Sequence, residues 1–349
     1  MNNNEKKKNK AVIIAAIGVV IAFCLIIGIV VLVKKYNDKN KAGSKGETTA
    51  DVTPKATDES AQKIDIDPSD YNNVVEFDGQ KYVYNTDIVN ILFIGVDKKG
   101  ELVEHKTPTF GGQADVIMLL SLNKSTKQCT ILQISRNSMM DIELMDSAGN
   151  VTGRRFAQLC LQYAYGNGKE TSCLAMKRRV KELLYDTVID GYITIDIDAI
   201  PILNDAVGGV EITVPEDYTW IDPSFKKGET VLLDGVHAEK YVRSRDINIT
   251  GSNNDRMHRQ VQYIPAMITK VRKKLGGTGL YDKFYPLIKN YLVTDLSADR
   301  IDQLADYNLS TDEIYFVPGN EQEIDGHDQF FVENYELQKI LIKMLYKLK

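Results

Sequence analysis

Cysteine is scarce in this sequence, and its placement matches no metal-binding pattern. The four cysteines are Cys24, Cys129, Cys160 and Cys173, and no two of them form a Cys-x-x-Cys pair. Structural zinc sites use closely spaced cysteine and histidine ligands, so the sequence gives no sign of a zinc domain. We interpret the last three cysteines as core residues, with a disulfide between Cys160 and Cys173 as an open alternative.

An excess of positive charge is also absent. Lysine and arginine together number 43 and aspartate and glutamate 48, which gives a formal net charge of −5 and a sequence pI of about 5.6. Proteins bind nucleic acid largely by neutralising phosphate with basic side chains. The composition therefore predicts no nucleic-acid partner.

Common catalytic motifs are missing as well. The four histidines form no His-Glu-x-x-His motif, and the segment Gly166-Asn167-Gly168-Lys169 lacks the glycine spacing and the hydroxyl residue of a phosphate-binding loop. Ser135 is not part of a Gly-x-Ser-x-Gly turn, so we interpret it as structural. These motifs name neither a nucleophile nor a general base.

One long apolar run lies near the N-terminus. Residues 11–33 carry no charged side chain, and about 23 residues at 1.5 Å per residue span the roughly 30 Å hydrocarbon layer of a membrane. We predict a cytoplasmic tail over 1–10 and a transmembrane helix over 11–33. A cleaved signal peptide is the alternative, but Lys34, Lys35 and Tyr36 follow the run in place of a small-residue cleavage site.

Lysines flank this run on both sides, so the positive-inside rule does not fix its orientation. We expect a single-pass plasma-membrane protein whose C-terminal domain is extracellular. Residues 34–70 are rich in polar and charged residues and almost lack large apolar ones, which predicts a flexible linker. Residues 71–349 then form one extracytoplasmic domain.

Short β-branched runs alternate with helical patterns in this domain. The runs that predict buried strands are 91–96, 116–122, 129–134 and 191–197. Helical spacing of apolar residues predicts helices over 170–186, 253–274, 281–291 and 330–348, the last with an apolar stripe that docks on the core. Alternating helices and strands predict an α/β fold with a central sheet covered by helices on both faces.

Two aspartates stand at the ends of predicted strands. Asp97 directly follows one apolar run, and Asp115 directly precedes the next. Ligands of open α/β sheets collect at the carboxyl ends of strands, and two nearby carboxylates suit a hard cation such as Mg²⁺. The alternative is that both residues only terminate strands in turns.

Arginines form the second group of candidates. Arg136 follows the third predicted strand, and Arg243 and Arg245 lie close together. Arg256, Arg259 and Gln260 are spaced so that a helix presents them on one face. Converging guanidinium groups suit a phosphate or pyrophosphate, whereas ordinary solvated arginines are the alternative.

Taken in order, these segments resemble the LytR-CpsA-Psr family, the membrane-anchored glycopolymer ligases of Gram-positive cell walls. The resemblance covers about residues 88–275. It is carried by the segments Asn90 to Asp97, Asp115 to Leu119, Ile134 to Ser138, Ala164 to Gly166, Asp205 to Ile212, Leu233 to Gly235, Tyr241 to Arg245 and Asp255 to Gln260.

The resemblance implies a central mixed β-sheet and a transferase activity. Such an enzyme takes a glycopolymer, such as teichoic acid or capsule, from a polyprenyl-pyrophosphate carrier and joins it through a phosphodiester to a peptidoglycan hydroxyl. Asp97 and Asp115 match the family's magnesium-associated carboxylates, so the expected cofactor is Mg²⁺. The family's catalytic and pyrophosphate-binding positions are matched by Arg136, Arg243, Arg245, Arg256, Arg259 and Gln260.

Several positions depart from the family pattern. Gln113 and Gln158 stand where an arginine and a lysine are usual, and Asn137 and Asn253 each stand where an aspartate is usual. Ser135 replaces a proline, Cys160 replaces an asparagine, and the candidate substitutes for the lost lysine are Arg154 and Arg155.

These departures motivate a second hypothesis, a catalytically impaired binder of polyprenyl-phosphate lipids with a structural or regulatory role in envelope assembly. A third, transcriptional control, follows from the family's older "attenuator" naming. The charge balance and the predicted membrane anchor argue against it.

Overall fold

The computed structural model describes residues 74–349 except 107–109, 247, 250 and 276–278. The chain divides into two compact units, Met1–Thr57 and Asp58–Lys349, and the described residues belong to the second. The predicted tail, transmembrane helix and linker lie outside the described residues. Within the described part, no helix combines the length and apolarity needed to cross a bilayer.

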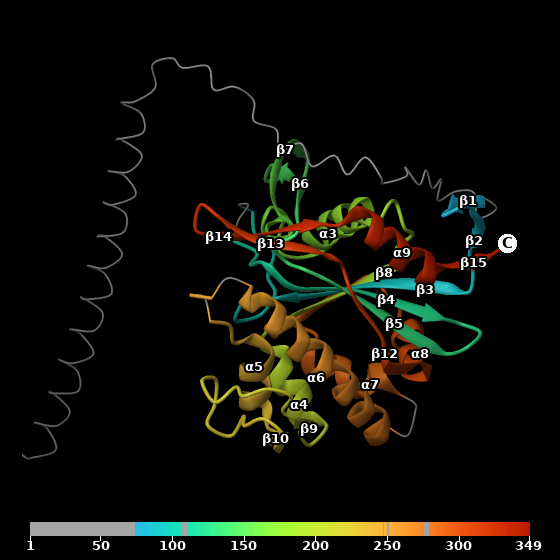
Figure 1. The fold of residues 1–349 in the computed structure, drawn as a ribbon. Coiled ribbons are helices and arrows are strands. Elements are labelled where there is room, and N and C mark those ends of the chain that lie inside the picture. Colours follow the sequence, from blue (N-terminus) through green and yellow to red (C-terminus); the bar gives the residue numbers. More distant parts are fainter. Residues whose placement is uncertain (1–73, 107–109, 247, 250, 276–278) are drawn as a thin grey trace, which may run out of the picture. The chain divides into compact units, whose positions relative to one another are not determined.

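The largest sheet in the described part of the chain has six strands (Figure 1). Their spatial order is β11 (Leu292–Thr294), β8 (Gly191–Asp196), β3 (Ile88–Val96), β4 (Ala114–Asn123), β5 (Gln128–Ile134) and β12 (Asn308–Phe316). The pairs β3 with β8 and β5 with β12 are parallel, and the other neighbours are antiparallel. The sheet is therefore mixed, as the family resemblance implies.

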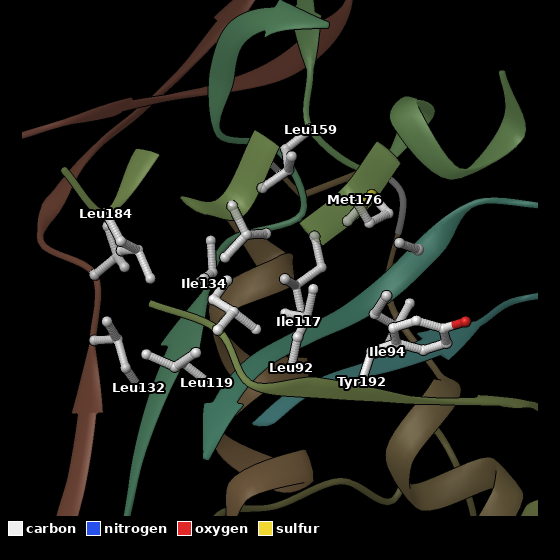
Figure 2. Close-up of a cluster of buried hydrophobic side chains, with 14 of the residues drawn as sticks. Leu92, Ile94, Ile117, Leu119, Leu132, Ile134, Leu159, Met176, Leu184 and Tyr192 are labelled. Atoms are coloured by element: carbon white, nitrogen blue, oxygen red, sulfur yellow. The ribbon is translucent and has the colours of Figure 1, made fainter. Parts of the chain in front are cut away.

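Helices cover both faces of this sheet. On one face, helices α3 (Glu170–Leu183) and α9 (Asn334–Leu345) pack over the main core. Figure 2 shows Leu92, Ile117 and Leu132 of this core together with Met176 of α3. On the other face, α6 (Ser252–Leu275) and α8 (Ala298–Gln303) cover residues such as Ile91 and Met118. Because successive strand side chains point to opposite faces, a central strand buried on both sides reads as a continuous apolar run.

A second, smaller core lies beside α6. It is formed by α4 (Ala199–Ala206), α5 (Gly235–Arg243), α7 (Leu280–Ile288), β9 (Val210–Thr213) and β10 (Thr230–Leu233). The rings of Phe225 and Tyr241 meet edge to face in it, with centroids 5.3 Å apart. This core holds α5 in place, and α5 ends at Arg243.

The remaining elements are hairpins and short segments. They are the hairpin of β6 (Met139–Met145) and β7 (Val151–Gln158), the hairpin of β13 (Gly319–Ile324) and β14 (His327–Val332), the sheet of β1 (Val74–Phe77), β2 (Gln80–Tyr84) and β15 (Tyr346–Leu348), and the helical segments α2 (Leu161–Ala164) and η1 (Leu304–Asp306). None of these hairpins was predicted from the sequence.

The four predicted strands and the helices near 170–186 and 253–274 are confirmed. The helix predicted over 330–348 is too long, because its first residues pair with β13 and its last three pair with β2. Pairing with neighbouring strands overrides the helical spacing at both ends. The predicted docking is confirmed, since Leu337, Leu341 and Leu345 are buried in the main core.

Candidate functional site

The sheet topology brings three predicted site residues to one edge. Strand β4 runs antiparallel to both β3 and β5, so β3 and β5 end where β4 begins. Asp97 follows the last residue of β3, Asp115 is the second residue of β4, and Arg136 lies two residues beyond β5. Three short motifs that are distant in sequence therefore meet because of strand order.

Asp115 joins two arginines from different elements. Its Oδ1 lies 2.9 Å from Nε of Arg136, and its Oδ2 lies 2.8 Å from Nη1 of Arg256 on α6. The side chain of Arg256 is buried, and burial lowers its pKa even though Asp115 opposes that effect. A buried guanidinium is stable only with a charged or polar partner, so Asp115 fixes the position of both arginines.

Asp97 makes the corresponding contact on the solvent side. Its Oδ1 lies 3.0 Å from Nη2 and 3.1 Å from Nε of Arg243, the last residue of α5. Both side chains are accessible to solvent. Three guanidinium groups and two carboxylates thus meet at this edge, and Glu239 also contacts Arg243, with 3.4 Å between its Oε1 and Nη1. Acidic and basic side chains therefore balance here, and the guanidinium groups supply the hydrogen-bond donors for an anion.

A cavity begins at this charged cluster and continues into the apolar interior. Its charged lining residues are Asp97, Asp115, Asp196, Arg243 and Arg256, and most of its wall consists of apolar side chains from β3, β8, α4 and α6. A second apolar cavity of about 290 Å³, lined mainly by α6, α7 and the sheet, shares Phe93 and Ile195 with the first. The two cavities together extend from the charged edge along the α6 face of the sheet.

The other three predicted site residues have different surroundings. Nη1 of Arg245 lies 3.4 Å from Oδ2 of Asp328 on β14. Gln260 lines the first cavity, and its Nε2 donates a hydrogen bond of 3.0 Å to the carbonyl of Val242. Arg259 does not line that cavity.

Arg259 instead binds the end of α5. Its Nε donates to the carbonyl of Tyr241 at 2.8 Å, its Nη2 donates to the carbonyl of Ser244, and its guanidinium lies 4.8 Å from the centroid of the Tyr218 ring. These contacts hold the segment that carries Arg243 and Arg245. In the described structure, Arg259 thus positions the phosphate-binding candidates.

A family model described as the LytR_cpsA_psr family matches residues 44–345, which is most of the chain. This chain belongs to that family. The polyisoprenyl-teichoic acid–peptidoglycan teichoic acid transferase TagU of Oceanobacillus iheyensis is 26% identical to it over 261 residues, covering 73% of this chain and 74% of that protein.

Two further comparisons concern a second relative and a solved structure. Biofilm regulatory protein A of Streptococcus mutans is 26% identical over 266 residues, which cover 72% of this chain but only 61% of that protein. The crystal structure of Bacillus subtilis TagV superposes with a TM-score of 0.53 at 21% identity, covering 74% of this chain and 98% of that one. The second comparison shows a shared fold.

The positions that depart from the family pattern contact one another around Arg136. Nη2 of Arg136 donates to Oε1 of Gln113 and lies 3.1 Å from Sγ of Cys160. Asn253 donates to Oγ of Ser135 at 3.3 Å and accepts a 2.8 Å hydrogen bond from Arg256 through Oδ1. Neutral side chains thus occupy places where the family pattern has charged ones, and two of them, Gln113 and Asn253, accept hydrogen bonds from guanidinium groups.

The hairpin of β13 and β14 completes this network. Nδ2 of Asn137 donates to Oε1 of Glu321 at 2.6 Å, and Nε2 of Gln158 donates to the carbonyl of Asp328 at 2.6 Å. Glu321 and Asp328 lie outside the segment of resemblance, and nothing in their local sequence points to the site. Sequence reasoning missed them for that reason.

The cysteines of the domain are free thiols. Burial raises the pKa of Cys160 to about 11, in spite of the nearby guanidinium of Arg136. This agrees with the interpretation of Cys129, Cys160 and Cys173 as buried core residues, and the structure does not contain the alternative disulfide.

Asp196 is a buried carboxyl at the end of β8. Its Oδ1 accepts hydrogen bonds from the backbone N–H groups of Asp198 and Ala199 at 2.9 and 3.1 Å, which caps the start of α4. Burial raises its pKa to about 7. Asp196 was not singled out in the sequence, because no motif distinguishes it from other aspartates at strand ends.

Proposed function

We propose that this chain is a phosphotransferase that moves a glycopolymer from a polyprenyl-pyrophosphate carrier to a hydroxyl of peptidoglycan. The observation that carries the proposal is the cavity that joins an edge bearing several arginines to an apolar interior. A carrier lipid has the matching chemistry, a diphosphate attached to a long apolar chain. The activity named for TagU, which this chain matches over 74% of that protein's length, supports the same reaction class.

The reaction requires one phosphorus–oxygen bond to form and one to break. The acceptor hydroxyl oxygen attacks the phosphorus next to the glycan and loses its proton, and the bond to the polyprenyl phosphate breaks. The products are a phosphodiester between glycan and acceptor and a free polyprenyl phosphate. Charge spread over the phosphate oxygens is the main electrostatic cost of such a transfer.

The positive charges of the arginines offset that electrostatic cost. Arg136, Arg243 and Arg256 approach one edge of the sheet, and we assign them to the diphosphate oxygens. Because Asp115 and Asp97 already orient these guanidinium groups, little reorganisation is needed when phosphate binds. Arg245 is paired with Asp328 beside the same edge and offers a further guanidinium group there.

Mg²⁺ is the cofactor that we propose for the two aspartates. Magnesium sites commonly use one or two carboxylates together with waters and substrate phosphates, and Asp97 and Asp115 line one cavity. Within the described ranges, no group of three or more His, Cys, Asp or Glu side chains could hold a metal ion by itself. Asp97 and Asp115 would hold the metal together with phosphate oxygens of the substrate, and the metal would neutralise charge on those oxygens when bound.

We further propose that residues 11–33 anchor the protein in the plasma membrane and that the domain lies outside the cell. The uncharged run supports the anchor. Both substrates support the location, because a polyprenyl carrier lies in the membrane and peptidoglycan lies beyond it.

Reconstitution of transfer tests the proposed function. Full-length protein in detergent micelles is given a radiolabelled polyprenyl-diphosphate glycan, peptidoglycan and Mg²⁺. We expect a phosphodiester-linked product that is released by mild acid. Arg243→Ala should reduce its formation strongly.

The neutral network around Arg136 favours a second candidate, a carrier binder without turnover. Gln113, Asn137 and Asn253 replace charged residues of the family pattern with neutral ones. Tight binding of the carrier with no product under any divalent cation would support this candidate and refute the transferase.

A further inference from the structure

A polar groove lies beside the phosphate-binding candidates, between the two hairpins. One wall is β7, with Arg155, Phe156 and Gln158, and the other includes His327, Asp328 and Gln329 of β14. The groove has a volume of about 690 Å³, which is in the range of ligand-binding pockets. No step of the proposed mechanism so far uses it.

The two walls are held together by hydrogen bonds. Nε2 of Gln158 donates to the carbonyl of Asp328 at 2.6 Å, and the backbone N–H of Phe330 donates to the carbonyl of Asn137 at 2.9 Å. Ser138 and Phe330 also form a parallel bridge between the two segments. The groove is therefore formed before any ligand binds, which lowers the ordering cost of binding.

The groove joins the phosphate-binding candidates directly. Arg136 and Arg245 line it, and Arg136 is also paired with Asp115 at the edge of the first cavity. A diphosphate placed at that edge would direct its attached glycan, or the attacking acceptor, into the groove.

The lining has the chemistry of a saccharide site. Its amide, carboxylate, imidazole and guanidinium groups are planar and provide both hydrogen-bond donors and acceptors. They match sugar hydroxyls, because each hydroxyl both donates and accepts a hydrogen bond. Phe156 is 53% exposed on β7, although a large apolar side chain gains by burial. Its ring offers a flat apolar surface for the C–H face of a pyranose.

Arg155 gives this groove a feature of its own. Arg155 lines the groove, whereas Arg154 is not among its lining residues and lies 3.8 Å from Glu182 of α3. Of the two candidates for replacing the lysine that is usual in the family, Arg155 is thus the one placed in the groove.

We propose that this groove binds the saccharide that reacts at the phosphate, with Phe156 as the stacking surface and Arg155 as a binding residue. The inference rests on the proposed function, because the first cavity must hold the diphosphate. The saccharide has two possible sources, the glycan of the carrier and the acceptor glycan. Their shared chemistry is a pyranose chain.

Binding measurements with the full-length protein in detergent micelles test this inference. Three probes are titrated by calorimetry: a peptidoglycan tetrasaccharide, farnesyl-diphosphate-linked N-acetylglucosamine, and farnesyl diphosphate without sugar. The variants are Phe156→Ala and Arg155→Ala. The matched control is Val151→Ala, because Val151 is 50% exposed on the same strand but does not line the groove.

We expect Phe156→Ala to weaken at least one saccharide probe roughly tenfold while farnesyl diphosphate changes by less than about twofold. If only the tetrasaccharide loses affinity, the groove binds the acceptor. If only the sugar-linked diphosphate loses affinity, the groove binds the glycan of the donor. The control should bind all three probes as the wild type does.

The inference is overturned if wild-type protein binds neither saccharide, or if both groove variants bind both saccharides as tightly as wild type. Transfer assays separate this result from the proposed function. Turnover with unchanged saccharide affinities in the variants refutes the groove alone. Saccharide binding that depends on Phe156 without any turnover refutes only the transferase.

Discussion

Two arginines of the charged edge should respond very differently to truncation. Arg243 and Arg256 each pair with one aspartate, but the Arg243 side chain is 42% exposed and that of Arg256 is only 5% exposed. We predict that Arg243→Ala reduces carrier binding with little loss of stability, whereas Arg256→Ala unfolds the site.

The magnitudes follow from burial. An exposed ion pair contributes about 0–1 kcal/mol, so Arg243→Ala should lower the free energy of unfolding by no more than that. Removing one partner of a buried pair costs about 3–5 kcal/mol, because Asp115 would remain buried with one of its partners missing. A lost hydrogen bond to a charged phosphate is worth about 1.5–3 kcal/mol, which weakens carrier binding roughly 10- to 150-fold.

Urea denaturation followed by circular dichroism measures the stability of each variant, and calorimetry with farnesyl diphosphate measures binding. Arg154→Ala is the matched control, because Arg154 belongs to an exposed pair with Glu182 away from the site. It should change neither quantity measurably. A folded Arg243→Ala variant with wild-type affinity would refute the assignment of Arg243 to phosphate.

Three further predictions address the metal, a buried carboxyl and a tight turn. Chelation by EDTA should abolish transfer and Mg²⁺ should restore it, and Asp97→Asn should raise the Mg²⁺ concentration needed for half-maximal rate; activity that persists in EDTA would contradict the metal. Asp196→Asn keeps the hydrogen-bond acceptor but cannot ionise. The fold raises the pKa of Asp196 from 3.8 to about 7, so ionisation lowers the stability of the wild type as pH rises through this range. The variant should therefore become increasingly more stable than wild type between pH 3.8 and about 7. Urea midpoints that stay parallel across this range would contradict that pKa. Gly166→Ala should cost about 1–3 kcal/mol of unfolding free energy, because a Cβ would lie 2.5 Å from the backbone of Ser172; a variant with the wild-type urea midpoint would show that the turn can relax.

The central strands and the charged edge could be predicted because they rest on strong local signals. Strand β3 reads as an apolar run that is buried on both faces, and Asp97 marks its end. Arg136 follows β5 in the same manner. The pairing of Asp115 with Arg136 follows from strand order and its pairing with Arg256 from the packing of α6, and the local sequence pattern predicts neither.

The hairpins could not be predicted for the opposite reason. Strand β7 is exposed along most of its length, and β13 consists mainly of polar residues, so neither shows the alternation that marks a half-buried strand. Their stability comes from pairing with β6 and β14. The contribution of Glu321 and Asp328 to the site therefore appears only in three dimensions.

Arg259 shows the limit of an argument from helix faces. Spacing places Arg256, Arg259 and Gln260 on one side of α6, but the arginines reach different neighbours. Arg256 meets the sheet at Asp115, and Arg259 meets the end of α5 at Tyr241. A shared face shows which residues are neighbours and does not show which of them contacts a ligand.

A crystal structure with a short polyprenyl diphosphate tests the account most directly. The diphosphate should lie between Arg136, Arg243 and Arg256, with the prenyl chain running past Phe93 into the apolar cavities on the α6 face. A ligand bound elsewhere, or one whose prenyl chain stays outside these cavities, would contradict the account.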